Sequence, residues 1–349
     1  MTSVSVCVPV FNGMPYLARC LESISAQTQQ PDEVLLVDDG STDGSLELCE
    51  AFVAGHPGAR LVRNPDNLGL TANWSRCLEL ATAEWVKFVF QDDWIAPRCL
   101  EVMTSSVQDG VDLVLSGRSY EYEPPVDDRV RQSYEQARQE SAARLGSQLR
   151  LVTVQELADE VRHWGSWNFL GEPVATLLRR SAAIELGGFS PHVVLLSDYL
   201  YLLRLALRGG LVWVPEQLAG FLVHPASTSG RLRASFGPAV IEPLAFHLAV
   251  LQDPELAAAM PRATPDYVAS VRYLAADALH RARLAVPPQT DAWERLRDDP
   301  VLGGLLRTWD LEHRRTGHRI ARRWRQRRGR TYEHLRVLSP GTASLLPPD

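Results

Sequence analysis

The chain has 349 residues, of which 45% are hydrophobic and 22% charged, values that are ordinary for a soluble globular enzyme. Its formal charge of −6 gives no overall attraction to nucleic acid or anionic lipid, so we expect no nucleic-acid partner. The five cysteines form no CxxC pair and are typical of core residues in a reducing compartment. A signal peptide and an uninterrupted apolar stretch of eighteen residues are both absent, so the sequence predicts a cytoplasmic protein.

Strands and helices alternate along the first 122 residues. Short apolar runs predict strands over residues 4–10, 33–37, 60–63, 85–90 and 112–122. Helical spacing of apolar residues predicts helices over 16–27, 46–53, 70–83 and 97–108. This order indicates an α/β fold with a parallel sheet and right-handed crossovers.

The pattern changes after residue 122. Residues 123–150 are polar and begin with two prolines, which predicts an exposed loop or a loose helix over the sheet edge. Apolar pattern returns later and predicts a helix over 199–207 and two strands over 211–214 and 218–223. We therefore divide the chain into a domain over 1–235, with 123–150 as a variable loop between its halves 1–122 and 151–235, and a helical region over 236–349.

Two acidic pairs directly follow predicted strands: Asp38-Asp39 in VLLVDDGSTDGS and Asp92-Asp93 in WVKFVFQDDW. Such strands deliver their carboxylates to the C-terminal edge of the sheet, where open α/β folds bind ligands. Adjacent carboxylates repel each other and are costly to bury, so they indicate a divalent cation or several hydrogen-bond donors. A helix N-cap is the alternative interpretation of the first pair.

Six segments, taken in order, resemble the family-2 glycosyltransferases of GT-A fold over about two thirds of the chain. They are VSVCVPVFNG, VLLVDDGSTDGS, RNPDNLGLTANWSRCLELATAEWVKFVFQDDW, LRRSAAIELGGFSP, LLSDYLYLLRLALRGG and AGFLVHPASTS. The resemblance implies a nucleotide-sugar-binding half over 1–122, an acceptor and catalytic half over 151–235, and a helical C-terminal extension. It also implies a nucleotide diphosphate sugar as donor and a hydroxyl group as acceptor.

The resemblance assigns residues to the nucleotide. It implies that Pro9 and Phe11 shape the base pocket and that Asp39 hydrogen-bonds the base. The turn with Asn67 and Gly69 would lie near the nucleotide. A carboxylate that accepts from a ring N–H, as uracil or thymine offers, favours UDP or dTDP donors over GDP.

The resemblance also assigns the second acidic pair. Asp92 would contact the ribose or the sugar, and Asp93 would bind the metal on the diphosphate. Mg²⁺ or Mn²⁺ suits this place, because either cation neutralises diphosphate charge through oxygen ligands. The family often has D-x-D or A-D-D here, whereas Gln91 precedes this pair, which predicts modest metal affinity. His224 would lie near the metal or the diphosphate, and a neutral histidine bonded to backbone is the alternative.

The acceptor half carries the remaining candidates. Asp198 opens a predicted amphipathic helix, and the resemblance makes it the general base of an inverting enzyme, although Ser197 replaces the family's preceding glutamate. An N-cap or a first-turn acid is the alternative. Trp164, Trp167 and Glu172 suggest an acceptor site in which an aromatic ring stacks on a sugar or a flat aglycone, and core packing is the alternative.

Together these features predict a metal-dependent inverting glycosyltransferase of the hexosyltransferase type. Its acceptor would be a hydroxyl of a glycan, a lipid-linked sugar or a small metabolite. A non-catalytic relative that binds a nucleotide sugar or a partner is the alternative. The segment 314–330 has nine arginines and no acid, which favours a solvated or subunit-facing helix over a peripheral membrane contact. The subunit-facing alternative predicts a homo-oligomer through the C-terminal helices.

Overall fold

The computed structural model describes residues 2–164, 168–189 and 195–234, together with the single residues Phe246 and Glu294. In this part of the chain the strands are β1 (Val4–Val10), β2 (Glu33–Asp38), β3 (Ala59–Arg63), β4 (Trp85–Phe88), β5 (Trp94–Ile95), β6 (Leu113–Tyr122), β7 (Arg150–Val152), β8 (Thr176–Arg179) and β9 (Leu211–Val223). The helices are α1 (Leu17–Ser25), α2 (Ser45–Gly55), α3 (Leu70–Leu80), α4 (Cys99–Ser105), α5 (Asp128–Leu145), α6 (Val154–Trp164), α7 (Arg180–Glu185), α8 (Ser197–Gly209), α9 (Thr228–Ala234) and the 3₁₀ helix η1 (Pro173–Ala175).

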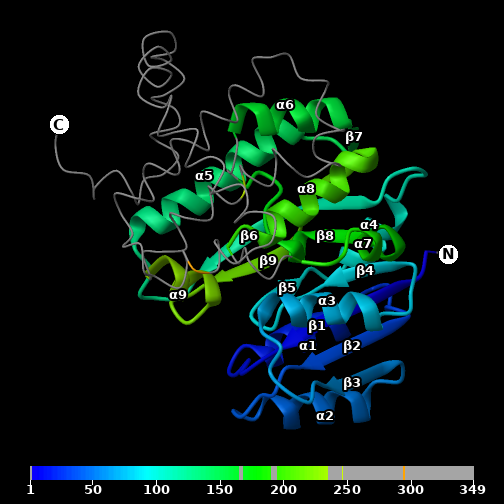
Figure 1. Cartoon of the computed structure of the whole chain (residues 1–349), viewed down its shortest axis with the longest axis vertical. Helices are drawn as coiled ribbons and strands as arrows, with labels where there is room; N and C mark the ends of the chain where they lie inside the picture. The colour runs from blue at the N-terminus through cyan, green and yellow to red at the C-terminus, as the bar shows by residue number, and fades with distance from the viewer. Residues whose placement is uncertain (1, 165–167, 190–194, 235–245, 247–293, 295–349) are drawn as a thin grey trace.

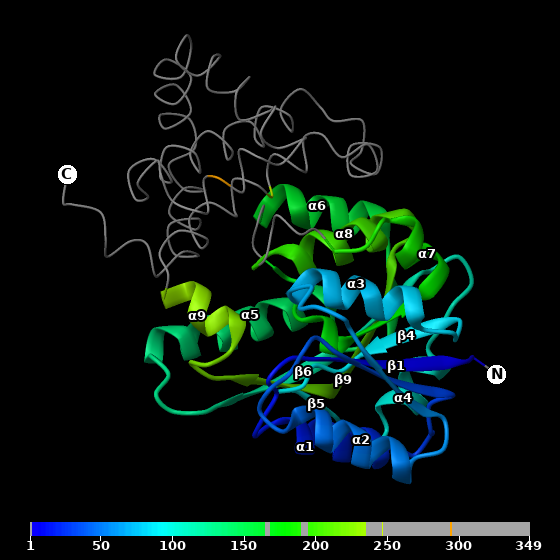
Figure 2. The same ribbon diagram turned by 60° about the horizontal axis from the view of Figure 1, so that its bottom comes forward.

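One sheet joins all of these strands, in the order β3-β2-β1-β4-β8-β6-β9-β5, with β7 paired to β9 (Figure 1). β1 pairs in parallel with β2 and β4, and β2 pairs in parallel with β3. Every residue of β1 and β2 is buried, as expected where helices cover both faces of a sheet. Figure 2 shows α1 and α2 on one side of the sheet and α3 and α8 on the other. The parallel arrangement predicted for the first half is confirmed.

Antiparallel strands interrupt the parallel order in the second half of the sheet, where β5 and β7 are each antiparallel to β9. β8 lies between β4 and β6 and is antiparallel to both, whereas β6 and β9 are parallel. The sheet is therefore mixed but mostly parallel, which confirms the predicted α/β class.

β9 corrects one prediction. The two strands predicted over 211–214 and 218–223 form a single strand, with a register irregularity opposite Gly117. A Cβ on Gly117 would lie 2.8 Å from the carbonyl oxygen of Glu216 and 2.9 Å from that of Pro215. The bulge lets the strand continue past a proline, which would otherwise end the pairing.

The polar segment 123–150 contains the regular helix α5, so it is not a loop over most of its length. The side chain of Asp127 accepts a hydrogen bond from the backbone amide of Arg129 at 2.7 Å and caps the helix. One face of α5 is buried, through Tyr134, Ser141 and Leu145. These few buried positions explain why the sequence shows little helical periodicity.

Three further predictions have different outcomes. All five cysteines are buried free thiols, as predicted. Within the described ranges, no helix combines the length and apolar character needed to cross a membrane. The helical region predicted over 236–349, with the arginine-rich segment, lies outside the described residues except for Phe246 and Glu294. The predictions of an oligomer through this region, of its possible membrane contact and of a cytoplasmic location therefore stay predictions.

Candidate functional site

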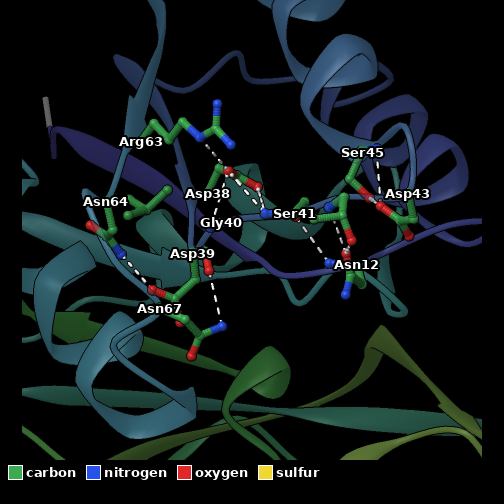
Figure 3. Close-up of polar contacts among 12 residues, drawn as sticks. Asn12, Asp38, Asp39, Gly40, Ser41, Asp43, Ser45, Arg63, Asn64 and Asn67 are labelled. Carbon is green, nitrogen blue, oxygen red and sulfur yellow. Dashed lines mark hydrogen bonds and ion pairs between the residues drawn. The ribbon is translucent and has the colours of Figure 1, made fainter.

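The loops that follow β1 and β2 are bonded to each other at the carboxyl edge of the sheet (Figure 3). The backbone amide of Asn12 donates to Ser41 Oγ at 3.0 Å, and that of Gly13 donates to Ser45 Oγ at 2.8 Å. In return, Asn12 Oδ1 accepts from the backbone amide of Thr42 at 2.8 Å. Asn12 has a φ of 48°, a left-handed conformation that asparagine tolerates better than most residues. The two loops therefore form one fixed surface.

Asp38, the first member of the first pair, shapes this surface from within. Its buried carboxylate accepts from the backbone amides of Gly40 and Ser41 at 3.2 Å, and Arg63 Nε lies 3.6 Å from it. These contacts turn the chain sharply at the end of β2. Asp38 is thus a structural residue of the loop.

Asp39, the second member, holds the turn that the sequence assigned to the nucleotide (Figure 3). Its Oδ1 accepts from Asn64 Nδ2 and from the amide of Leu68, both at 2.8 Å, and its Oδ2 accepts from the amide of Gly69 at 2.9 Å. Asn67 Nδ2 donates to the backbone oxygen of Asp39 at 3.0 Å. Gly69 has a φ of +84°, which glycine adopts without strain. A carboxylate offers about four acceptor positions, and the described residues fill three of them.

Large apolar side chains stay exposed on these loops. Phe11 is 45% exposed, Met14 42% and Leu68 44%. Exposed apolar groups rimmed by polar loops are typical of ligand-binding surfaces. Pro9, by contrast, is buried inside β1 and pairs with Val37, so it acts on any pocket only through the strand.

Gln91 joins the Phe11 loop to the second acidic pair. Its side-chain Oε1 accepts from the Phe11 amide at 2.8 Å, and its Nε2 donates to the Phe11 carbonyl oxygen at 3.0 Å. A Cβ on Gly13 would lie 2.7 Å from Gln91 Oε1, so the glycine leaves room for this amide. Gln91, the residue that differs from the usual family motif, therefore binds the loop that follows β1.

The strand pair β5 and β9 fixes the position of the second acidic pair. The two strands are antiparallel, with Trp94 opposite Gly220. The Trp94 indole covers Gly220 so closely that any Cβ there would overlap the ring. The Arg19 guanidinium lies 3.5 Å over the Trp94 ring centroid. Trp94 is thus clamped directly after Asp93.

This pairing brings three predicted residues together. The backbone amide of Leu222 donates to Asp93 Oδ1 at 3.1 Å, and His224 Nε2 lies 3.1 Å from Asp92 Oδ2. The Tyr16 ring packs on His224 with 4.5 Å between centroids. Burial, with a hydrogen bond to a neighbouring carboxylate, raises the pKa of Tyr16 to about 12. Tyr16 therefore stays a neutral phenol at this edge.

Asp93 and His224 each keep one ligand atom without a partner. Asp93 is 1% exposed, and its Oδ2, like His224 Nδ1, is buried without a hydrogen-bond partner among the described residues. Burial, followed by the charges of Asp92 and Glu172, raises the pKa of Asp93 well above its usual value. A carboxylate oxygen and an imidazole nitrogen are both ligands for divalent cations, so these two residues fit one.

Within the described ranges, no group of three or more His, Cys, Asp or Glu side chains is arranged to hold a metal ion. Mg²⁺ commonly takes only one or two protein carboxylates and completes its shell with phosphate oxygens and water. The residues present therefore suit a cation that arrives with a phosphorylated ligand.

A buried network surrounds Glu172 in the second half of the domain. Arg118 Nε lies 2.6 Å from Glu172 Oε2, and Tyr120 Oη lies 3.1 and 3.2 Å from the two carboxylate oxygens. Sequence reasoning missed Arg118, Tyr120 and the fully buried Lys87 of β4. The signal for Lys87 and Arg118 was a basic residue inside a predicted strand, in WVKFVF and in LVLSGRSYEY.

The other predicted residues have simpler positions. Asp198 lies in the first turn of α8, as predicted, and is half-buried. Its Oδ1 lies 2.6 Å from the Tyr199 amide nitrogen. Its catalytic role stays a prediction. Trp164 is the last residue of α6. Trp167 lies outside the described residues.

Solved structures of low sequence identity share this fold. TarS of Staphylococcus aureus, residues 1–349 in complex with UDP-GlcNAc, has a TM-score of 0.54 at 17% identity, over 93% of this chain and 92% of that one. The mannosyltransferase PcManGT of Pyrobaculum calidifontis, in complex with GDP-Man and Mn²⁺, has a TM-score of 0.51 at 19% identity, over 96% and 85%. The predicted GT-A fold is confirmed.

Sequence comparison finds nearer relatives. The uncharacterized protein MT1568 of Mycobacterium tuberculosis is 33% identical over 222 residues, 62% of this chain and 66% of that protein. Glycosyltransferase GlyG of Streptococcus pneumoniae is 34% identical over 120 residues, 34% of this chain and 40% of that protein. The matches thus span 66% or less of these relatives' own lengths. Residues 5–183 match the model of glycosyl transferase family 2, more than half of the chain, and the protein belongs to that family.

Proposed function

We propose that this protein transfers a sugar from a nucleotide diphosphate donor to an acceptor hydroxyl, with inversion at the anomeric carbon. The observation that carries the proposal is Asp93, a buried carboxylate in the loop between β4 and β5 whose Oδ2 has no hydrogen-bond partner in the described part of the chain. It follows the loops of β1 and β2, on which Asp39 and the exposed Phe11 lie. A family-2 chain with this arrangement suits a nucleotide on the loops and a diphosphate at Asp93.

UDP or dTDP is the proposed nucleotide. Asp39 keeps one acceptor position, and a pyrimidine with a ring N–H can donate to it. The flat faces of a base suit the exposed Phe11 and Leu68 side chains. The neighbours of low identity carry either UDP-GlcNAc or GDP-Man, so GDP is the rival that the experiment has to exclude.

Mg²⁺ or Mn²⁺ is the proposed cofactor, held by Asp93 and His224. Such a cation would neutralise the negative charge that the leaving diphosphate develops. Asp92 bonds His224 Nε2, which leaves the Nδ1 atom of the ring as the metal ligand. This second contact fixes the ring orientation, as is usual around histidine ligands.

Asp198 is the proposed general base. It lies in the first turn of α8, where the helix dipole favours the ionised carboxylate that a base requires. Asp198 would take the proton of the acceptor hydroxyl as its oxygen attacks the anomeric carbon. Trp164, Trp167 and Glu172 stay the predicted contacts for the acceptor.

The test is release of nucleoside diphosphate from UDP-, dTDP- and GDP-sugars, with Mn²⁺ and with EDTA. We expect UDP or dTDP donors to turn over, and EDTA to abolish turnover. Asp198→Asn should lower turnover by about 10² or more while UDP affinity stays unchanged. Asp128→Asn, which changes an exposed first-turn acid of α5, is the matched control.

Four outcomes would contradict parts of this proposal. Full activity in EDTA would contradict the metal cofactor. GDP binding at least as tight as UDP binding would contradict the assignment of a uracil or thymine nucleotide. Turnover above roughly a third of wild type in Asp198→Asn would make that residue a first-turn acid of α8 without a catalytic role. Nucleotide binding without turnover of any donor favours the non-catalytic alternative.

A further inference from the structure

The backbone that leads into β8 is held by side chains where the sheet ladders stop. The pairing of β4 with β8 ends at Val86 opposite Leu178, and that of β6 with β8 ends at Leu115 opposite Thr176. Residues 171–175, which include η1, precede both ladders and lie toward the carboxyl edge of β4. Their carbonyl groups need other donors, because they are buried.

Lys87 and Ser116 supply these donors. Lys87 Nζ donates to the carbonyl oxygen of Val174, and to that of Thr176 at 3.2 Å, while Ser116 Oγ donates to that of Ala175 at 3.1 Å. Lys87 is fully buried, and burial lowers its pKa. A core lysine is costly, and an apolar residue would fill this space without that cost. We therefore interpret the lysine as a residue that fixes the backbone segment whose carbonyl oxygens it binds.

The same segment presents Glu172 on a rigid support. Arg118 Nε lies 2.6 Å from Glu172 Oε2 and donates to Tyr120 Oη at 2.8 Å. Gly171 has a φ of +79°, and the Arg118 guanidinium occupies the space of any Cβ there. Arg118 has a 2% exposed side chain, whereas that of Glu172 is 15% exposed. The carboxylate thus keeps an accessible side although its partners are buried.

The order of the strands places Glu172 along a bound donor. Asp39 follows β2, Phe11 follows β1, Asp93 follows β4, and Glu172 precedes β8, which is the next strand of the sheet. A nucleotide sugar has the same linear order: base, ribose, diphosphate and sugar. A carboxylate repels phosphate and accepts hydrogen bonds from hydroxyl groups, so it suits the sugar.

We propose that Glu172 binds hydroxyl groups of the sugar carried by the donor, and that Lys87 is the positioning residue that holds Glu172 in place. The proposal rests on the proposed function, and it moves Glu172 from the acceptor to the donor side of the reaction. Arg118 and Tyr120 orient the carboxylate, and Lys87 and Ser116 fix the backbone behind it.

Hydrolysis of the donor in water, with no acceptor present, isolates this contact. The probe is the UDP- or dTDP-sugar that the wild-type protein hydrolyses fastest. Glu172→Gln should lower kcat/KM by about 10-fold or more, the scale of one hydrogen bond to a charged group. UDP affinity with Mn²⁺, measured by calorimetry, should stay unchanged. Glu160→Gln, which removes a carboxylate paired with Arg144 at 2.6 Å, is the matched control and should behave as wild type.

Lys87→Met tests the positioning role, because methionine keeps an unbranched chain and removes the donor. We expect a lower kcat/KM with unchanged UDP affinity, and no further loss when Glu172→Gln is added, since both changes act on one contact. A general weakening of the fold would lower UDP affinity as well. If Lys87→Met does not fold, Ser116→Ala removes a donor to the same segment and should show the same non-additivity.

Clear results would overturn the proposal. If Glu172→Gln hydrolyses the donor as fast as wild type and loses activity only when an acceptor is added, Glu172 binds the acceptor and not the donor sugar. Independent, multiplicative losses in the double variant remove the link between Lys87 and Glu172. A wild-type protein that turns over no donor refutes the proposed function itself, and this outcome is distinct from unaffected variants of an active enzyme.

Discussion

Replacing Asp93 by asparagine should stabilise the metal-free protein at neutral pH while removing most of its turnover. Asp93 is almost fully buried, its Oδ2 has no hydrogen-bond partner among the described residues, and burial raises its pKa. The folded protein therefore holds this proton at pH values where the unfolded chain has released it. Stability then falls as pH rises above about 4, the ordinary aspartate value, by up to about 1.4 kcal/mol per pH unit until the raised pKa is reached.

Urea unfolding in EDTA at several pH values between 5 and 7 measures this slope. Asp93→Asn has no carboxyl to ionise at this position, so the free energy of unfolding of the wild type should fall relative to that of the variant as pH rises. Mn²⁺ should then stabilise the wild type and leave the variant almost unchanged, because a bound cation favours the ionised carboxylate. Turnover of the donor should be lost in the variant.

Parallel pH dependences of the two proteins would refute the reasoning, because Asp93 would then release its proton equally in both states. Asp66→Asn, in the exposed turn before Asn67, is the matched control for removing one negative charge. It should follow the wild type at every pH and keep the response to Mn²⁺.

Three further predictions concern stability and nucleotide binding. Gln91→Met should weaken UDP binding equally with and without Mn²⁺ in calorimetry, because Gln91 binds the Phe11 backbone; weakening only with Mn²⁺ would assign it to the metal. Gly171→Ala should cost about 2 kcal/mol or more in urea unfolding, since its Cβ overlaps Arg118, and a variant as stable as wild type would contradict that packing. Asp39→Asn places an NH₂ group against amide donors and should lower stability by about 1–3 kcal/mol together with UDP affinity; an unchanged thermal midpoint would count against it.

The first half of the fold was predictable because burial on both faces makes β1 and β2 continuous apolar runs. The site at the carboxyl edge followed from the same runs, since Asp39 directly follows β2 and Asp93 lies in the loop that leads from β4 to β5. The different structural roles of Asp38 and Asp39 could not be predicted from the sequence. They depend on Arg63 and Asn64, which reach the two carboxylates only after β3 has paired.

The second half was less predictable for physical reasons. Pro215 suggested the end of a strand, whereas a bulge opposite Gly117 lets β9 continue. Lys87 and Arg118 are charged, and charged residues are assumed to be exposed unless their partners are known. Those partners are backbone carbonyls and Glu172, far along the chain, so no local pattern shows them.

The place of β8 has a consequence for how the chain folds. β8 is synthesised after β4 and β6, and it fills the position between them in the sheet. A nascent chain that has reached only residue 122 would expose an unpaired edge of β4 and both edges of β6, which are sites for aggregation. These pairings join residues about sixty to ninety positions apart, so the contact order is high and folding is expected to be slow. Because the pairings of β8 link the two halves of the domain, we expect the halves to fold together as one unit.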